Sequence, residues 1–305
     1  MSSAPVKHSM SSSPKNSLGP RVGDKRKASP TPEPARKVVR GGPRDFGLAQ
    51  ILESTDIAQP LVTRHESPCD TFREVFCCDL AGPVSMVVYR SRPSRVMAIR
   101  TFTQNRTDQM LEIFRNIQHE NILSAIECYK DGETVYFRFD DFPVTLEHLV
   151  ACDAYPTETQ LALILSQLLQ GLSHLLKCGL AHQSLICSNI LLSWSGILKI
   201  AGLEHCIEHL PGQSQAPMMN ALATIAMELM QNYDKDDGLR GIDDVNRWPV
   251  ESWPFKFLEA TTTAVSVEQL KHHIHGPAGT DGKGELQWLA RFALVSARTF
   301  YTYKT

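Results

Sequence analysis

The sequence predicts an α+β fold, with a small β-rich half followed by a larger, mainly helical half. Three observations indicate this fold. Between about residues 70 and 143, short runs rich in Val, Ile, Phe and Tyr are separated by turn residues. After Pro143 the apolar residues recur with a helical period. Hydrophobic residues make up 42% of the 305 residues, which is enough for a core. We expect a cleft between the two halves.

The N-terminal segment, residues 1–45, has a different composition from the rest. It is rich in Ser, Pro, Lys and Arg and has almost no large apolar side chains, so we expect it to be disordered. Two basic clusters, Lys25-Arg26-Lys27 and Arg36-Lys37, have the arrangement of a bipartite nuclear-import signal. A solvated basic tail is the alternative interpretation. We expect the folded domain to span residues 46–276, and residues 277–305 to form a linker and an amphipathic helix.

Composition favours some classes of protein and disfavours others. The net charge of −2 gives no sign of a nucleic-acid-binding surface beyond the basic tail. No run approaches the roughly 20 apolar residues of a membrane span, and the first residues lack the apolar core of a secretory signal. The eight cysteines include no CxxC pair, so the sequence predicts reduced, mostly buried thiols and no metal site. We therefore expect an intracellular protein.

The β-rich half is predicted to contain four strands and one helix. The helix is expected over Thr107–Ile117, where apolar residues follow a period near 3.6, with Thr107 as its N-cap. The four strands are the runs "FREVFCCDL" (72–80), "PVSMVVYRS" (83–91), "RVMAIRTF" (95–102) and "ETVYFRFDDF" (133–142).

The second half is predicted to contain five helices. Thr157 and Gln160 form an approximate capping box at the start of a long helix, and Gly179 ends it. The segment 218–231 is apolar nearly all round, which is typical of a helix at the centre of a domain. The other helices are expected at Thr145–Ala151, at 266–274 with Ser266 as N-cap, and at 284–301.

The predicted C-terminal helix has an apolar face, which we consider to be Leu286, Leu289, Phe292, Ala293 and Val295. One interpretation is that this face packs on the helical half. The other is that it docks a partner.

Several short motifs occur in a fixed order along residues 70–276. They include "MAIR" (97–100), "IQHENIL" (117–123), "HQSLICSNILL" (182–192), "GILKIAGLE" (196–204) and "ALATIAMEL" (221–229). In this order and spacing the chain resembles the eukaryotic protein kinases. The resemblance implies the two-lobed protein-kinase-like fold, with an N-lobe at about 70–143 and a C-lobe at about 144–276.

The resemblance also indicates where the groups for phosphoryl transfer would lie, and most are replaced. Arg100 stands where the family has its phosphate-binding lysine, and Ser184 where it has the loop aspartate that orients the attacking hydroxyl. Gly202, followed by Leu203, stands where it has the magnesium-binding aspartate. Ala81, Pro83 and Met86 replace the glycines of the glycine-rich turn, and Met110 replaces the glutamate that holds the lysine. Phe139 and Asp140 lie at the expected hinge. His182 and Asn189 match the family's residues.

These replacements predict a pseudokinase, a kinase-like protein without catalysis, that acts as a binding or regulatory scaffold. We expect no intact set of catalytic residues, no bound metal and no required cofactor. Binding of ATP without strong dependence on Mg²⁺ stays open as an alternative. Its partners would be proteins, either an active kinase or a nuclear protein. The alternative is an atypical active Ser/Thr kinase that uses Arg100, Asn189 and Glu204. Otherwise we expect Glu204 to be a solvated loop carboxylate and His182 a core histidine that braces its loop.

Overall fold

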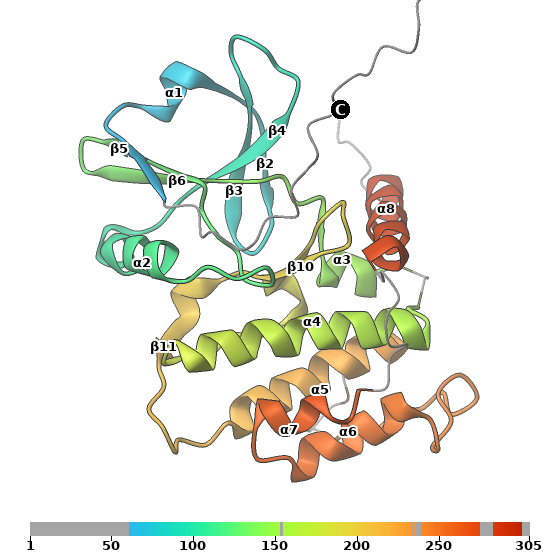
Figure 1. Ribbon diagram of the computed structural model, residues 1–305. Coiled ribbons are helices and arrows are strands. Elements are labelled where there is room, and N and C mark those ends of the chain that lie inside the picture. Colours follow the sequence, from blue (N-terminus) through green and yellow to red (C-terminus); the bar gives the residue numbers. More distant parts are fainter. Residues whose placement is uncertain (1–60, 153–154, 234, 236–238, 275–282, 301–305) are drawn as a thin grey trace, which may run out of the picture. The chain divides into compact units, whose positions relative to one another are not determined.

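The structure is a computed structural model that describes residues 61–152, 155–233, 235, 239–274 and 283–300. Residues 1–60 and 275–282 lie outside the described residues, and with them both basic clusters and the predicted bounds of the domain at residues 46 and 276. The described residues fold as a β-sheet region followed by a helical region, as the sequence predicts (Figure 1).

The N-lobe is built on a six-stranded sheet with the strand order β1-β5-β6-β4-β3-β2. Strand β1 runs parallel to β5, and the other neighbours are antiparallel. Helix α2 lies beneath the sheet, on the side of the helical region (Figure 1). The elements are β1 (Val62–Arg64), α1 (Pro68–Thr71), β2 (Phe72–Asp79), β3 (Pro83–Tyr89), β4 (Val96–Thr101), α2 (Gln104–Asn116), β5 (Glu127–Asp131) and β6 (Thr134–Phe139).

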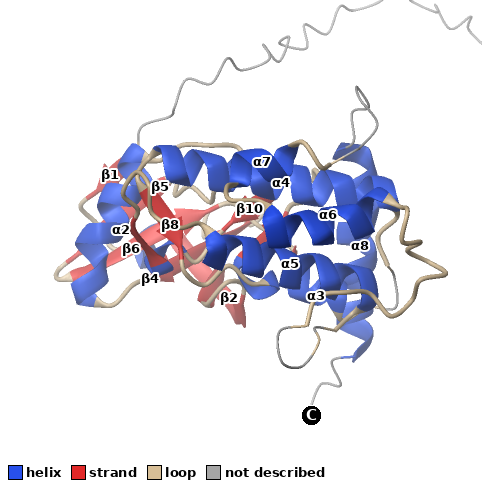
Figure 2. Cartoon of the chain, turned by 90° about the horizontal axis from the view of Figure 1, so that it is seen from below, coloured by secondary structure: helices blue, strands red, loops and turns tan. Residues whose placement is uncertain are grey.

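The C-lobe is mainly helical, and its helices pack around α4 and α5 (Figure 2). Its helices are α3 (Leu146–Val150), α4 (Glu158–Lys177), α5 (Ala216–Gln231), α6 (Trp253–Thr263), α7 (Val267–Lys271) and α8 (Lys283–Phe300), with short 3-10 turns η1 (Cys187–Asn189) and η2 (Leu203–His205). Its short strands are β7 (Val144–Thr145), β8 (Leu180–His182), β9 (Ile190–Leu192), β10 (Leu198–Ile200) and β11 (Cys206–Glu208). Strands β10-β9-β7 and β11-β8 form two small sheets.

The long helix α4 begins and ends as its sequence predicts. The Thr157 hydroxyl accepts from the Gln160 N–H at 3.2 Å, and the Gln160 side chain accepts from the Thr157 N–H at 2.9 Å. Gly179 follows the helix in a left-handed conformation, with φ +75°. Helix α5, predicted to be central, is buried on most of its surface. The capping box and the αL glycine satisfy backbone groups that a helix end leaves open.

Two predicted helices differ from the structure by three residues at one end. Helix α2 begins at Gln104 with Thr103 as its N-cap, so the prediction of Thr107 as N-cap was wrong. Thr107 is buried inside the helix and its hydroxyl donates to the Thr103 carbonyl at 3.3 Å. Helix α7 ends at Lys271, before the predicted residue 274.

Helix α8 divides its apolar residues between two faces. Leu286, Leu289 and Ala293 are completely buried, and α8 packs on α3, α4 and β7. Phe292 and Val295 are exposed, so their assignment to the packed face was wrong. The packing interpretation of α8 therefore holds for one face, while the other face stays open in the described part of the chain.

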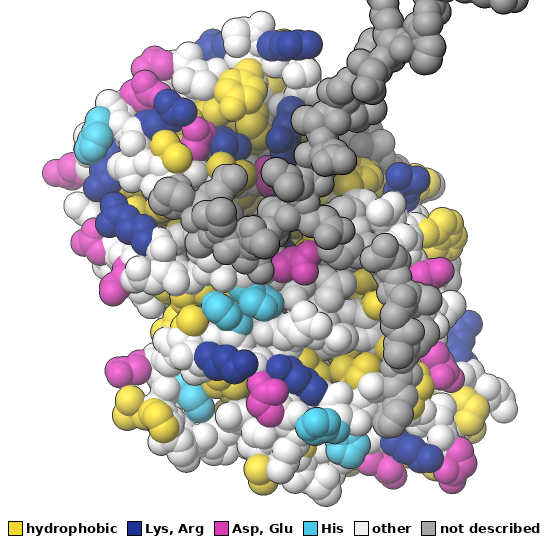
Figure 3. All heavy atoms as spheres, in the orientation of Figure 1, with side chains coloured by type: hydrophobic (Ala, Val, Ile, Leu, Met, Phe, Trp, Pro, Cys, Tyr) yellow, Lys and Arg dark blue, Asp and Glu magenta, His cyan; other side chains and the backbone are white. Residues whose placement is uncertain are grey.

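The thiols are less buried than predicted. All eight cysteines are free, but only Cys128, Cys152, Cys187 and Cys206 are buried. Charged side chains of both signs are interspersed over the visible face of the molecule (Figure 3). No described helix has the combination of length and apolar character needed to cross a bilayer.

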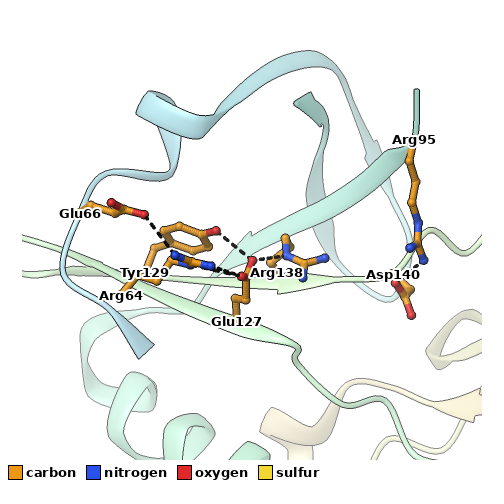
Figure 4. Close-up of polar contacts among 7 residues, drawn as sticks. All are labelled: Arg64, Glu66, Arg95, Glu127, Tyr129, Arg138 and Asp140. Atoms are coloured by element: carbon orange, nitrogen blue, oxygen red, sulfur yellow. Dashed lines mark hydrogen bonds and ion pairs between the residues drawn. The ribbon is translucent and has the colours of Figure 1, made fainter. Parts of the chain in front are cut away.

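A carboxylate cluster holds β1 against the sheet (Figure 4). The Glu127 carboxylate accepts from Arg64 Nη2 at 2.9 Å, from Arg138 Nε at 2.5 Å and from the Tyr129 hydroxyl at 2.9 Å. Strands β1 and β6 each contribute one residue to it, and β5 contributes both Glu127 and Tyr129. Glu127 and Arg138 are buried, so the ions are stable there only because they pair with one another.

Candidate functional site

The turn between β2 and β3 lies where the resemblance places a glycine-rich phosphate-binding turn. Strand β3 already begins at Pro83, so Pro83 and Met86 are strand residues and do not belong to the turn, contrary to our expectation. The turn consists of Leu80, Ala81 and Gly82, since Asp79 pairs with Pro83. A turn this short offers few backbone N–H groups to a phosphate.

Arg100 fills the space beneath this turn. Its Nη1 donates to the Ala81 carbonyl at 2.7 Å. A Cβ atom on Gly82 would lie 2.4 Å from Arg100 Nη2, and Gly82 has φ +109°. A side chain at position 82 would therefore displace the end of the Arg100 side chain, and the positive φ of this position favours glycine.

Glu204 is the ion-pair partner of Arg100. Arg100 Nη2 donates to Glu204 Oε1, and the two side chains are only 10% and 12% exposed. The expectation that Glu204 is a solvated loop carboxylate was wrong. The position expected for the family's glutamate, Met110, is completely buried as an apolar side chain. The cation of β4 is thus held by the protein's own carboxylate from the C-lobe.

Further contacts join the same two lobes. Arg106 of α2 donates to the Glu204 carbonyl, and Gln109 Nε2 donates to the Cys206 carbonyl at 3.4 Å. Arg100 Nε and Glu204 Oε2 are buried without a hydrogen-bond partner, so the ion pair is incompletely satisfied. Arg106 could not be predicted from the sequence, because a donor to a distant backbone carbonyl leaves no local pattern.

His182 is committed to the backbone of its loop. Its Nε2 donates to the Ala201 carbonyl at 2.8 Å, and its Nδ1 accepts from the Ser184 N–H at 3.2 Å. Burial lowers the pKa of His182, so the ring is neutral at pH 7. With both nitrogens occupied, this imidazole braces the loop and has no free atom for a substrate.

Asn189 and Gly202 occupy the place expected for a magnesium site. The Asn189 amide donates to the Ser184 carbonyl at 2.8 Å and lies 3.3 Å from the Ser184 hydroxyl. A Cβ atom on Gly202 would lie 3.0 to 3.2 Å from the Asn189 side chain. The amide therefore covers the position from which an aspartate side chain would extend. Among the described residues, no group of three or more His, Cys, Asp or Glu side chains is placed to hold a metal.

Replacing Gly202 with alanine is expected to lower the free energy of unfolding by about 2 kcal/mol. About 1 kcal/mol comes from the left-handed backbone, with φ +69°, and the rest from crowding Asn189. Gly132→Ala is the matched control, since Gly132 has φ +58° and nothing within 4 Å of its added Cβ. Urea unfolding of both variants measures the difference. Equal losses in the two variants would show that Asn189 does not restrict position 202.

The space expected for an adenine ring is nearly closed. Its cavity is only about 20 Å³, which is room for about one water molecule. Leu80, Val84, Phe139 and Leu191 are among its lining residues. At the adjoining hinge the Asp140 carboxylate pairs with Arg95 at 2.7 Å. Of the predicted cleft residues, Arg100, Phe139 and Asp140 thus lie together in the lining of this small cavity.

The fold and the order of these positions define a protein of the kinase class. A family model described as protein kinase domain matches residues 82–233, about half of the chain. Mitogen-activated protein kinase HOG1B of Wallemia ichthyophaga is 34% identical over 97 residues, which are 31% of this chain and 26% of that protein. Mitogen-activated protein kinase sma-5 of Caenorhabditis elegans is 30% identical over 111 residues, 34% of this chain and 22% of that protein.

The chain belongs to the protein kinase-like superfamily. Its matched segments span only about a quarter of the length of the curated relatives. The activity and partners of those whole proteins are therefore not transferred to this chain.

Proposed function

We propose that this chain is a kinase-like protein without phosphoryl-transfer activity, which acts by binding other proteins. The observation that carries the proposal is the buried Arg100–Glu204 pair, together with the bond from Arg100 to the Ala81 carbonyl. In a kinase the corresponding cation pairs with the nucleotide phosphates. Here its charge is neutralised within the protein, so a phosphate would have to displace Glu204.

The acid–base and metal positions support the same proposal. Ser184 has no carboxylate to accept a proton from an attacking hydroxyl. Gly202 supplies no ligand for Mg²⁺, and the Asn189 amide is bonded to Ser184. Removing one charge-stabilising group typically slows a reaction by about 100- to 1000-fold, and several are replaced here.

The active-kinase alternative requires Glu204 to act with Asn189 at the metal. The Glu204 Oε1 atom instead accepts from Arg100, and in the described part of the chain no group of three or more His, Cys, Asp or Glu side chains is placed to hold a metal. For the nucleotide, the cavity of about 20 Å³ supports the absence of a bound adenine in this conformation. Nuclear localisation through Lys25-Arg26-Lys27 and Arg36-Lys37 remains part of the proposal, with a nuclear protein or an active kinase as the partner.

The test is ATP consumption by the purified full chain, combined with thermal unfolding in ATP, with and without Mg²⁺. We expect no turnover above the buffer blank and no Mg²⁺-dependent rise of Tm, because a ligand raises Tm only by binding the folded state. Asn189→Ala is compared with Asn246→Ala, a change at an exposed loop residue. Turnover that is lost in Asn189→Ala and kept in Asn246→Ala would overturn the proposal in favour of an active kinase.

A further inference from the structure

Strand β2 forms one edge of the N-lobe sheet. In the strand order it follows β3 and has no neighbour on its other side among the described strands. Two large apolar side chains on this strand, Val75 and Phe76, are 50% and 51% exposed. The outward backbone groups of such an edge are a template for pairing with another extended chain.

A cavity opens on the outer face of the sheet beside this edge. Its volume is about 300 Å³, at the lower end of the range for ligand sites and sufficient for one large apolar side chain. Phe72, Val87, Ile99 and Tyr136 line it. The first three belong to a small apolar cluster that is separate from the main core. This cavity shares Val84 and Arg100 with the lining of the adenine space, but all its other lining residues differ from those of that space.

The charge at the cavity indicates the chemistry of its ligand. Glu74 lines the cavity from β2 and is exposed. No hydrogen bond or ion pair engages its carboxylate within the described part of the chain. Residues two apart in a strand share one face, so a segment paired with β2 presents alternate side chains toward the cavity. A bound segment would fit the apolar lining with one apolar side chain in the cavity, and would fit the unpaired carboxylate with a basic side chain beside Glu74.

The shape of β2 favours a short segment over a second copy of the same strand. The register with β3 shifts between Glu74 and Phe76, which is a bulge or a similar irregularity. Such a feature bends an edge strand and disfavours long edge-to-edge pairing. The exposed charges of Arg73, Glu74 and Asp79 act in the same direction.

We propose that β2 and this cavity bind an extended, basic segment of a protein partner. The segment adds a strand to the sheet edge, places one apolar side chain in the cavity and sets a Lys or Arg two residues away beside Glu74. The proposal goes beyond the absence of catalysis, because it concerns the outer face of the N-lobe and holds whether or not ATP is turned over.

The test uses the full chain and a pool of fluorescein-labelled octapeptides. In each peptide the side chains on one face of the extended strand are all threonine. On the other face they are lysine, except for one apolar residue (Leu, Ile, Val, Phe or Met) intended to enter the cavity. We expect saturable binding by fluorescence anisotropy, weakened at least about tenfold by Glu74→Lys. Glu133→Lys, the same change at an exposed turn residue, leaves binding unchanged. Peptides methylated on their pairing amides also bind at least about tenfold more weakly, because they cannot donate to β2.

The cysteines provide a second readout of position. Cys77 lines the cavity and is exposed, while Cys178 is exposed at the end of α4, outside the cavity. Bound peptide should protect Cys77 from N-ethylmaleimide and leave Cys178 reactive, as measured by mass spectrometry.

Four outcomes would overturn the proposal. One is the absence of saturable binding by any peptide up to about 1 mM, which corresponds to about −4 kcal/mol of binding free energy. Two others are equal binding of the methylated peptides and equal protection of both thiols. The fourth is protection of Cys77 that rises with protein concentration in the absence of peptide, which would assign the edge to a second copy of the chain.

Discussion

Replacing Glu127 with alanine is expected to lower the free energy of unfolding by about 3–5 kcal/mol. The change leaves the Arg138 guanidinium, only 10% exposed, without its carboxylate, and removes the bond that ties Arg64 of β1 to the sheet. An uncompensated buried charge accounts for a loss of this size. Urea unfolding at pH 7 measures it, with two-state behaviour checked by a second probe.

Glu66→Ala is the matched control for Glu127. Glu66 lies 3.9 Å from the same Arg64, but both side chains are more than 40% exposed, so we expect a change within about 0.5 kcal/mol. A loss below about 1 kcal/mol for Glu127→Ala would contradict the view that this cluster stabilises the sheet.

The same carboxylate gives the N-lobe a defined pH dependence. Burial alone would raise the pKa of Glu127, but the hydrogen bonds from Arg64, Arg138 and Tyr129 outweigh burial and lower it below 4.5. A lowered pKa in the folded state means that the contribution is complete above about pH 4.5 and is lost as pH falls through the folded value. The difference in stability between wild type and Glu127→Gln should therefore shrink below about pH 4.5.

Replacing Arg100 with methionine is expected to lower the free energy of unfolding by about 3–5 kcal/mol at pH 7. Methionine retains most of the side chain's volume but leaves the Glu204 carboxylate, 12% exposed, without a cation. The bond to the Ala81 carbonyl is lost as well. Urea unfolding measures the loss, and we expect the double variant Arg100→Met, Glu204→Leu to recover most of it, because an apolar pair of similar volume often replaces a buried ion pair without loss.

Arg95→Met provides the comparison for an exposed pair. Arg95 and Asp140 are 64% and 48% exposed, so the expected loss is at most about 1 kcal/mol. If Arg100→Met behaved like Arg95→Met, the Arg100–Glu204 pair would be a solvated contact and would not support the proposed function.

The fold class and the central elements of the C-lobe were predictable because their signals are local. The capping box of Thr157 and Gln160 lies within one turn of helix, and the apolar pattern of 218–231 fits a helix buried on most of its surface. The start of α2 was misjudged for a local reason too. Gln104, Asn105 and Arg106 are all polar, so the first turn of this helix carries no apolar period.

The ion pairs were not predictable, because their partners are far apart in the chain. Arg100 and Glu204 are separated by 104 positions, and Arg64 and Glu127 by 63. Neither pair has a spacing that a helix or strand would impose. Strand β1 has only three residues, too few for a pattern, and is defined by pairing with β5. The cleft positions could be read from the resemblance, but the closure of the cleft could not.

The packing of Arg100 beneath Gly82 couples the evolution of these two positions. A side chain at 82 would displace the Arg100 guanidinium from its contacts and would be strained by the positive φ of this position. A shorter residue at 100 in turn strands Glu204, which then has to change as well. Because the loss of either partner leaves the other buried without its counter-ion, we expect positions 100 and 204 to change together in evolution.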